Sequence, residues 1–256
     1  MSKKVLFVSH LGMGDMIVMC GAVRYFTTIY NEIHVVCIDT YYNNVKMMYQ
    51  DNNNIKIISI NPNNDEYSIA NELIKDYEYK GYDICLTGQH KRNKIGINFT
   101  YDDLHKTFYN DLDLDISIMK DYFNIAFNIE SINLYKKIPK FLKYIFIHTL
   151  SSSKNIFIDV KKFKEDDILI INPNTNMYDI NDKYYELANE FINKPIFIYT
   201  DIIINALELH MVDSSFSCMS ALLNTNTSQN KYLYPRNNDR PYKNVIYKSL
   251  FDNTWI

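Results

Sequence analysis

The sequence predicts an α/β protein made of two successive units, each a parallel sheet with helices on both faces. The first observation behind this prediction is an alternation in both halves of the chain. Short apolar runs rich in β-branched residues are followed by stretches with helical spacing. The second observation is length: 256 residues, of which 47% are hydrophobic, suffice for one large domain or two small ones.

The chain opens on a strand, a glycine turn and a helix. Residues 5–8 form an apolar run typical of a buried parallel strand. Gly12 and Gly14 form the turn, and Asp15 is placed to cap the helix that follows. Apolar residues recur at helical spacing at 16, 17, 19, 20, 23 and 26. In open α/β sheets such a turn lies at the carboxyl ends of the strands, where ligands bind.

The remaining elements of the two halves follow the same alternation. In the first half we expect strands at 32–38, 55–59 and 83–87, and helices at 42–49 and 65–80. In the second half we expect strands at 144–148, 167–171, 195–199, 210–213 and 231–234, and helices at 180–192, before 209 and at 214–223. Between them lies an aromatic, charged region with short helical patterns such as 116–127. We place the linker near 130–143 and the two domains at 1–140 and 141–256.

Three interpretations compete for the turn at Gly12–Asp15. It is an ordinary turn with an Asp cap, a dinucleotide-binding fingerprint, or a catalytic base facing a neutral hydroxyl. The fingerprint would use Asp39 to hold a ribose. However, Ile17 stands where the third glycine belongs, and Asp15 puts a carboxylate where a pyrophosphate would lie.

The third interpretation gains from a resemblance. The run Gly12-Met-Gly-Asp15, followed by an apolar helix containing Gly21-Ala-Val-Arg24, resembles the start of the heptosyltransferase-like glycosyltransferases of family 9. The resemblance implies a GT-B-like fold, with two Rossmann-like units facing across a cleft. It also implies that the Gly-Asp pair lies on the acceptor side, with Asp15 as the base. The acceptor-side residues would be Gly12, Met13, Gly14 and His90.

A second motif lies in the other half of the chain. After residues 210–213 come Ser214, Ser215 and Ser217 at the start of a helix, where free N–H groups and hydroxyls can bind phosphate. A plain serine N-cap is the alternative. The resembling family carries Asp-Thr/Ser-Gly and then a His here, where the donor diphosphate binds. Asp213 and Ser214 match this pattern, whereas a serine replaces the Gly and Cys218 replaces the His.

Further residues are candidates for binding the donor and for acting beside the catalytic base. The polar loop after the strand at 167–171 contributes Asn172 and Asn174. Lys154 substitutes for the basic residue that the family often carries to offset the leaving diphosphate. His10 and His90 follow the first and fourth strands, so they point to one sheet edge, and His10 joins Asp15 as a catalytic candidate. Two more histidines at strand ends of the second unit, His148 and His210, border the donor.

Three aspartates at alternate positions invite a metal interpretation. Asp-x-Asp binds the metal and nucleotide in the other large glycosyltransferase fold, where it ends a strand. Here Asp111, Asp113 and Asp115 precede a helical pattern. We therefore expect solvated carboxylates at a helix start, and neither a metal nor another cofactor.

Composition excludes several other classes. The net charge of −3, without a basic stripe, argues against a nucleic-acid partner. The N-terminus shows no signal peptide, and no apolar run approaches the roughly 20 residues of a membrane span. Four separated cysteines in apolar contexts, without metal or redox spacing, indicate free thiols in a reducing compartment. We expect a cytoplasmic protein, either free or peripheral to a membrane.

These observations favour an inverting, metal-independent glycosyltransferase of glycan biosynthesis. It would move a sugar from a nucleotide-sugar donor, bound by the second domain, to a glycan or glycolipid hydroxyl bound on the first. Two alternatives stay open: a nucleotide-sugar epimerase of the same fold, and a non-catalytic protein that binds nucleotides or glycans.

Overall fold

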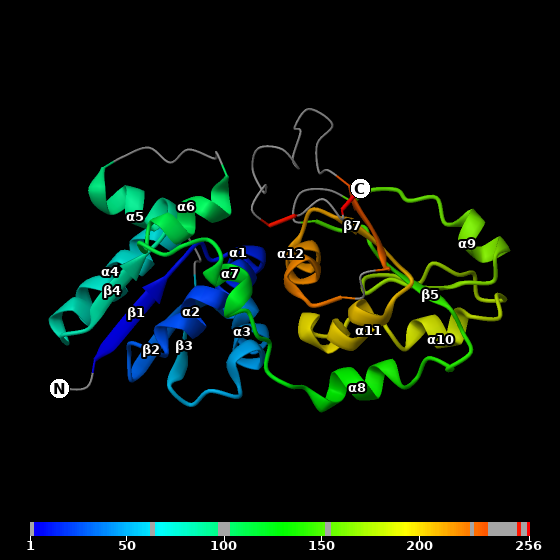
Figure 1. Ribbon diagram of the computed structural model, residues 1–256, viewed down its shortest axis with the longest axis horizontal. Coiled ribbons are helices and arrows are strands. Elements are labelled where there is room, and N and C mark those ends of the chain that lie inside the picture. Colours follow the sequence, from blue (N-terminus) through cyan, green and yellow to red (C-terminus); the bar gives the residue numbers. More distant parts are fainter. Residues whose placement is uncertain are drawn as a thin grey trace. The chain divides into compact units, whose positions relative to one another are not determined.

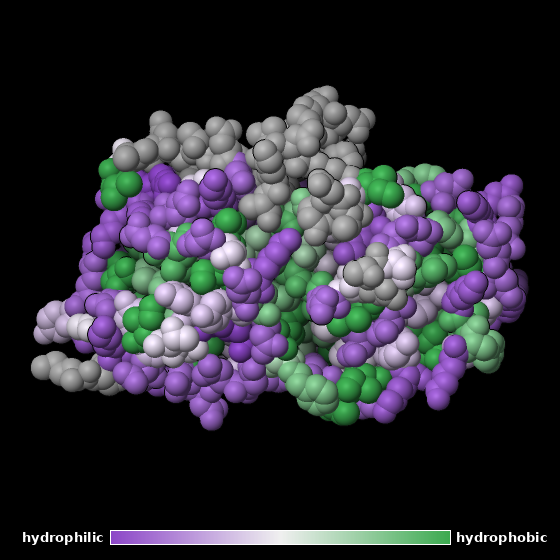
Figure 2. Space-filling view, in the orientation of Figure 1, coloured by the Kyte–Doolittle hydropathy of each residue, from purple (hydrophilic) through white to green (hydrophobic). Residues whose placement is uncertain are grey.

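The computed structural model describes residues 3–61, 65–96, 103–151, 155–225, 228–234, 250–251 and 255–256. The chain divides into two compact units, the first up to Phe127 and the second from Asn128, except that Leu250 belongs to the first. Each unit holds one four-stranded parallel sheet (Figure 1). Hydrophilic and hydrophobic residues interleave over the visible face of each unit (Figure 2). No helix among the described residues has the length and apolar character needed to cross a membrane.

The first unit carries a sheet of order β3-β2-β1-β4, in which every neighbouring pair is parallel. Its strands are β1 (Lys4–Val8), β2 (Glu32–Ile38), β3 (Ile55–Ile60) and β4 (Asp83–Leu86). Its helices are α1 (Met13–Val18), α2 (Cys20–Phe26), α3 (Tyr42–Tyr49), α4 (Glu66–Tyr79), α5 (Gly88–Ile95), α6 (Leu104–Asn110) and α7 (Ile118–Asp121), with a 3₁₀ turn η1 (Asp39–Tyr41). The predictions of all four strands, and of α3 and α4, are confirmed.

Alternation along β1 distributes the apolar side chains to both faces of the sheet. Leu6 and Val8 belong to a buried cluster that includes Ile74 of α4. Phe7 points the other way, and its ring lies 6.0 Å from that of Phe26 on α2. Because β1 is buried on both faces, it reads in the sequence as a continuous apolar run rather than an alternating one.

The expected single helix over residues 16–26 is instead two helices that meet at Met19. The Tyr109 hydroxyl donates a 2.8 Å hydrogen bond to the carbonyl of Val18 and also takes a bond from the backbone of Ala22. It thereby occupies both groups of the bond that would continue the helix. A side chain inserted into the helical ladder is an ordinary cause of such a break.

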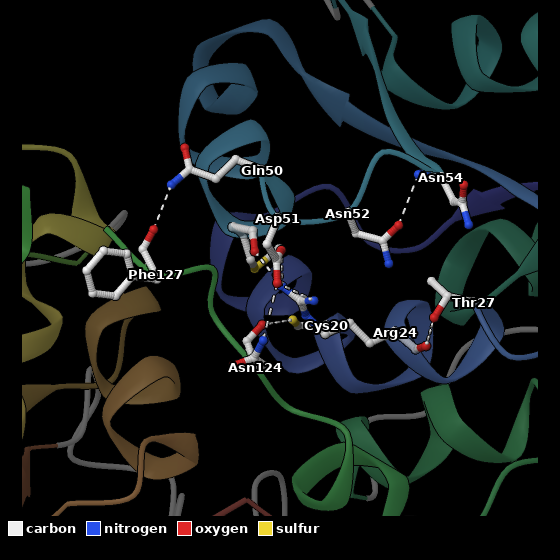
Figure 3. Close-up of polar contacts among 10 residues, drawn as sticks. Cys20, Arg24, Thr27, Gln50, Asp51, Asn52, Asn54, Asn124 and Phe127 are labelled. Atoms are coloured by element: carbon white, nitrogen blue, oxygen red, sulfur yellow. Dashed lines mark hydrogen bonds and ion pairs between the residues drawn. The ribbon is translucent and has the colours of Figure 1, made fainter. Parts of the chain in front are cut away.

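The motif Gly21-Ala-Val-Arg24 has a structural role within this unit (Figure 3). Arg24 donates to both carboxylate oxygens of Asp51, at 2.9 and 3.2 Å. Asn124 donates to the same carboxylate at 3.4 Å, while its carbonyl accepts from the Cys20 thiol. A Cβ on Gly21 would lie 2.5 Å from a backbone carbonyl oxygen of α7. These residues therefore fasten α2 to the last segment of the unit.

The second unit carries a parallel sheet of order β6-β5-β7-β8. Its strands are β5 (Tyr144–His148), β6 (Leu169–Ile171), β7 (Glu208–Val212) and β8 (Asn230–Tyr234). Its helices are α8 (Ile129–Tyr135), α9 (Lys161–Glu165), α10 (Tyr185–Asn189), α11 (Thr200–Asn205) and α12 (Ser215–Leu222), with a 3₁₀ turn η2 (Ile196–Tyr199).

Three local predictions for residues 116–199 were wrong or too long. The run 195–199 is not a strand but the 3₁₀ turn η2, all four residues of which are buried. Length and periodicity cannot separate so short an apolar run from a buried helical turn. The helices expected at 116–127 and 180–192 shrink to the single turns α7 and α10. The region expected to be a linker begins with α8, which packs against η2 and α11 of the second unit.

Candidate functional site

Each sheet has one place where the chain order reverses, between β1 and β4 in the first unit and between β5 and β7 in the second. The loops after the two strands diverge there, and ligands of open α/β sheets bind outside this point. We call residues 9–15 and 87–90 the first switch point. Residues 148–149 and 213–217 form the second switch point. The predicted site residues divide between them.

At the first switch point a backbone amide clamps His10. The N–H of Gln89, in the first turn of α5, donates a 2.8 Å hydrogen bond to His10 Nε2. Nε2 therefore accepts, and in the neutral ring the proton resides on Nδ1. Nδ1 lies 3.9 Å from Asp15 Oδ2. The ring also packs edge-on against Phe108, with centroids 4.8 Å apart.

The clamp depends on Gly88. Its φ is +59°, in the left-handed region that favours glycine. A Cβ there would lie 2.5 Å from His10 Nε2 and 2.7 Å from the Phe108 ring, so no other residue fits without displacement. The N–H of Gly88 donates a 2.8 Å bond to the Asp111 carboxylate.

The expectation that Asp111 is a solvated carboxylate is therefore wrong. Its side chain is only 5% exposed and forms an ion pair with Arg92 of α5. The Gly88 N–H and the Arg92 guanidinium compensate the cost of burying this negative charge, so the carboxylate can lie below the surface. Asp113 and Asp115 are exposed. Among the described residues, no cluster of three His, Cys, Asp or Glu side chains could hold a metal ion.

The histidines of this region are neutral at neutral pH. Burial lowers the pKa of His10 to about 4; Arg92 acts in the same direction, and Asp111 opposes it. Burial, aided by His10, lowers the pKa of His90 to about 4 and that of His105 to about 3. The first switch point thus carries uncharged imidazoles beside the Asp15 carboxyl.

Asp15 does not cap its helix as expected. The helix α1 begins at Met13 with Gly12 as its N-cap, and Asp15 lies in the first turn. Glycine is well tolerated at an N-cap, and a carboxylate in the first turn interacts favourably with the helix dipole. The Asp15 side chain is 25% exposed, and its Oδ2 would lie 3.0 Å from a Cβ placed on Gly12. A carboxylate is therefore held at the surface of the sheet edge.

At the second switch point β5 delivers His148 to the face covered by α12. The rings of Phe146 and His148, two residues apart, pack against Phe216 with centroids 5.5 and 4.5 Å away. His148 Nδ1 lies 3.0 Å from the Ser214 hydroxyl. Burial lowers the pKa of His148 to about 4, so this ring is also neutral at neutral pH.

The serines at the start of α12 have different roles. Ser214 is the N-cap and forms a capping box with Ser217, whose hydroxyl is buried and accepts the Ser214 N–H at 2.9 Å. Ser215 is half-buried. Within the described part of the chain, the N–H groups of Ser215 and Phe216 donate to no protein acceptor. Two donors therefore stand open at the positive end of this helix.

The other predicted donor residues are placed less directly. Asn172 follows β6 and is buried, and its Oδ1 accepts the N–H of Asn174 at 2.9 Å, which forms a tight turn at the sheet edge. Asp213 ends β7, is buried, and donates its N–H to β8. Lys154 lies outside the described residues. These assignments stay predictions.

Two predicted acceptor-side residues are buried, and a predicted donor-side histidine lies within a strand. On the acceptor side, Met13 is 7% exposed and His90 is 2% exposed, whereas Gly12 and Gly14 lie at the surface of the turn. His210 contacts Tyr234 and Glu208 through its two nitrogens and lies in the middle of β7 rather than at its end. Its contact with a donor stays a prediction.

Sequence reasoning missed the support of the first switch point. Gly88, Gln89 and Arg92, which hold His10 in place together with Asp111, were not singled out, and Asp111 was assigned to a solvated helix start. The glycine directly after a predicted strand was the available signal for Gly88. Nothing in the sequence pairs Asp111 with α5, because 19 positions separate it from Arg92.

The sequence matches no protein-family model and no curated protein sequence. Solved structures resemble the chain over its whole length. The glycosyl transferase family 9 protein of Veillonella parvula DSM 2008 superimposes with a TM-score of 0.64 at 11% identity, covering 100% of this chain and 86% of that one. The ADP-heptose LPS heptosyltransferase II of E. coli superimposes with a TM-score of 0.60 at 12% identity, over 100% and 89%.

A third similar structure is E. coli heptosyltransferase WaaC with ADP-2-deoxy-2-fluoro heptose. It has a TM-score of 0.51 and 8% identity, and the match covers 99% of this chain and 92% of that one. The predicted GT-B-like fold of two Rossmann-like units is thereby confirmed. At these identities the fold is what the proteins share.

Proposed function

We propose that this protein is a glycosyltransferase that uses a nucleotide-sugar donor. The donor diphosphate would bind at the second switch point, on the open N–H groups of Ser215 and Phe216. The acceptor, a glycan or glycolipid hydroxyl, would bind at the first. Two of the proteins of similar fold are heptosyltransferases, one of them solved with ADP-2-deoxy-2-fluoro heptose, which favours this reaction class.

The single observation that carries the proposal is the contrast between two helix N-termini. In α5 the first N–H groups already donate to Asp111 and His10, so a phosphate would displace protein acceptors. In α12 the corresponding N–H groups are open. Anions bind to helix N-termini through such free N–H groups and the positive end of the dipole. This contrast favours a phosphate site in the second unit.

The chemistry follows from this division. Asp15 would accept the proton of the acceptor hydroxyl, whose oxygen attacks the anomeric carbon from the face opposite the diphosphate. The carbon–oxygen bond to the diphosphate breaks, and the configuration inverts. The N-terminus of α12 would stabilise the negative charge on the departing diphosphate without a metal ion. At neutral pH the rings of His10 and His148 are uncharged, so neither adds a positive charge at its switch point.

A screen of nucleotide sugars by thermal unfolding tests the proposal. A ligand at 100 times its dissociation constant stabilises the folded state by about 2.7 kcal/mol, which is easily detected. We expect stabilisation by a nucleotide sugar and by its nucleoside diphosphate. Release of the diphosphate only when an acceptor glycan is added supports transfer. Release without an acceptor indicates the epimerase or a hydrolase, and binding without turnover indicates a non-catalytic binder.

A further inference from the structure

The fold determines which nitrogen of His10, the neighbour of Asp15, carries the ring proton. His10 Nε2 accepts the Gln89 N–H at 2.8 Å, so the neutral ring must carry its proton on Nδ1. A backbone amide cannot reverse its role as a donor. The tautomer is therefore set by the fold rather than by solvent.

The clamp that sets the tautomer is itself rigid. The adjacent Gly88 holds a left-handed conformation with its N–H on Asp111, a largely buried carboxylate paired with Arg92. Phe108 packs against the ring of His10. Both the position of the ring and its rotation are thus fixed from behind, away from Asp15.

The protonated nitrogen faces the proposed base. His10 Nδ1 lies 3.9 Å from Asp15 Oδ2, about 1 Å longer than a hydrogen bond. Contacts of this kind are often long without substrate and shorten when it binds. Gly12 leaves room for the carboxylate, because a Cβ there would lie 3.0 Å from Oδ2.

We propose that His10 is a positioning residue for Asp15. Its Nδ1–H tautomer, imposed by the Gln89 amide, orients the carboxylate and stabilises its ionised form. The catalytic part of this statement rests on the proposed role of Asp15, whereas the tautomer and its contact do not.

The charged and titratable groups around His10 agree with a neutral ring. Burial and Arg92 lower the pKa of His10, and Asp111 opposes them. The ring therefore stays a neutral donor to Asp15 across the neutral range of pH.

The test is ¹⁵N NMR of the full chain labelled on its six histidines. We expect His10 to carry its proton on Nδ1 and to show Nε2 as an unprotonated acceptor throughout pH 5 to 8. Asp15→Asn should move the Nδ1 resonance without changing the tautomer. Asp113→Asn is the matched control, because Asp113 is exposed and Asn tolerates its left-handed φ of 57°. A proton on Nε2 would overturn the proposal, as would an Nδ1 resonance equally indifferent to both variants.

A second measurement tests the effect on Asp15 itself. The carboxyl pKa of Asp15, followed by ¹³C NMR, should rise by about one unit in His10→Leu, because a donor to the charged form is lost. In His10→Asn it should stay near that of the unaltered protein, since Asn keeps a donor near the position of Nδ1. An unchanged pKa in His10→Leu would contradict the positioning role. If the pKa rises as expected while Asp15→Asn leaves turnover intact, the contact stands and the proposed base is wrong.

Discussion

The two switch points contain the same kinds of groups, but the N–H groups at their helix starts are occupied differently. In each, a histidine at or just beyond the end of the unit's first strand contacts the start of the helix across the reversal, His10 on α5 and His148 on α12. On α5 the histidine accepts the N–H of Gln89, and the Asp111 carboxylate accepts that of the preceding Gly88. On α12 the histidine meets a side-chain hydroxyl, and two backbone donors stay open. Whether a helix N-terminus can bind an anion is therefore decided by what already occupies its N–H groups, rather than by the strand–loop–helix pattern alone.

Removing the carboxylate of the first switch point has the largest expected effect. Asp15→Asn keeps the size of the side chain but cannot accept a proton, so turnover should fall by about 10²–10⁴-fold. Affinity for the donor should barely change, because the proposed phosphate site lies in the other unit. Turnover and donor affinity should be measured on the same purified variant. Turnover near that of the unaltered protein would remove Asp15 from the mechanism, with His10 the next residue to test.

Filling the space beside His10 should damage the first unit. Gly88→Ala places a methyl 2.5 Å from His10 Nε2 in a left-handed backbone, and we expect a loss of about 2–5 kcal/mol in unfolding free energy. Gly81→Ala is the matched control, because φ is +77° and nothing lies within 4 Å of the added methyl. That change should cost only about 1 kcal/mol. Denaturant unfolding of both variants distinguishes the clash from the backbone cost, and equal losses would mean that the His10 clamp is loose.

Acid should weaken both units through their neutral histidines. His10 and His148 have folded-state pKa values of about 4, below the usual 6.5, so at pH values between these the unfolded chain binds protons that the folded chain does not. Stability is then fully present above pH 6.5 and falls as pH drops toward 4, by up to about 1.4 kcal/mol per pH unit for each ring. His10→Asn and His148→Asn should each reduce the slope of unfolding free energy against pH by about one proton. An unchanged slope in one variant would show that its histidine is protonated in the folded protein.

Substituting each of two serines at the second switch point should show which of them stabilises the start of α12. Ser214→Ala removes the hydroxyl that caps α12 and contacts His148, with an expected loss of about 1–2 kcal/mol. Ser215→Ala should change stability by less than about 0.5 kcal/mol, because its side chain is half-buried and takes no part in the capping box. Trp255, the single tryptophan, belongs to the second unit and reports its unfolding by fluorescence. If both variants lose the same stability, Ser214 is not the cap that matters.

Much of the fold followed from periodicity, whereas the site followed only in part. Strands such as β1 and β2 combine apolar runs with β-branched residues and were predicted closely. The 3₁₀ turn η2 was not, because four buried apolar residues after a proline suit either structure. Likewise the break at Met19 depends on Tyr109, about 90 positions away, which no local pattern reveals.

The same limit applies to the two switch points. His10, Asp15 and Ser214 were found because each lies at a strand end or at the helix start next to it. The burial of Asp111, and the open state of Ser215 and Phe216, depend on contacts that form only in the folded chain. A sequence shows where helices start, but whether their N–H groups are available to an anion depends on tertiary structure.

The most direct measurement is a crystal structure of the full chain with a bound nucleoside diphosphate. The account predicts phosphate oxygens within hydrogen-bond distance of the N–H groups of Ser215 and Phe216, with the N-terminus of α5 still bonded to Asp111 and His10. Phosphates on the turn at Gly12 and Gly14, or on the start of α5, would contradict the assignment of phosphate binding to the second switch point.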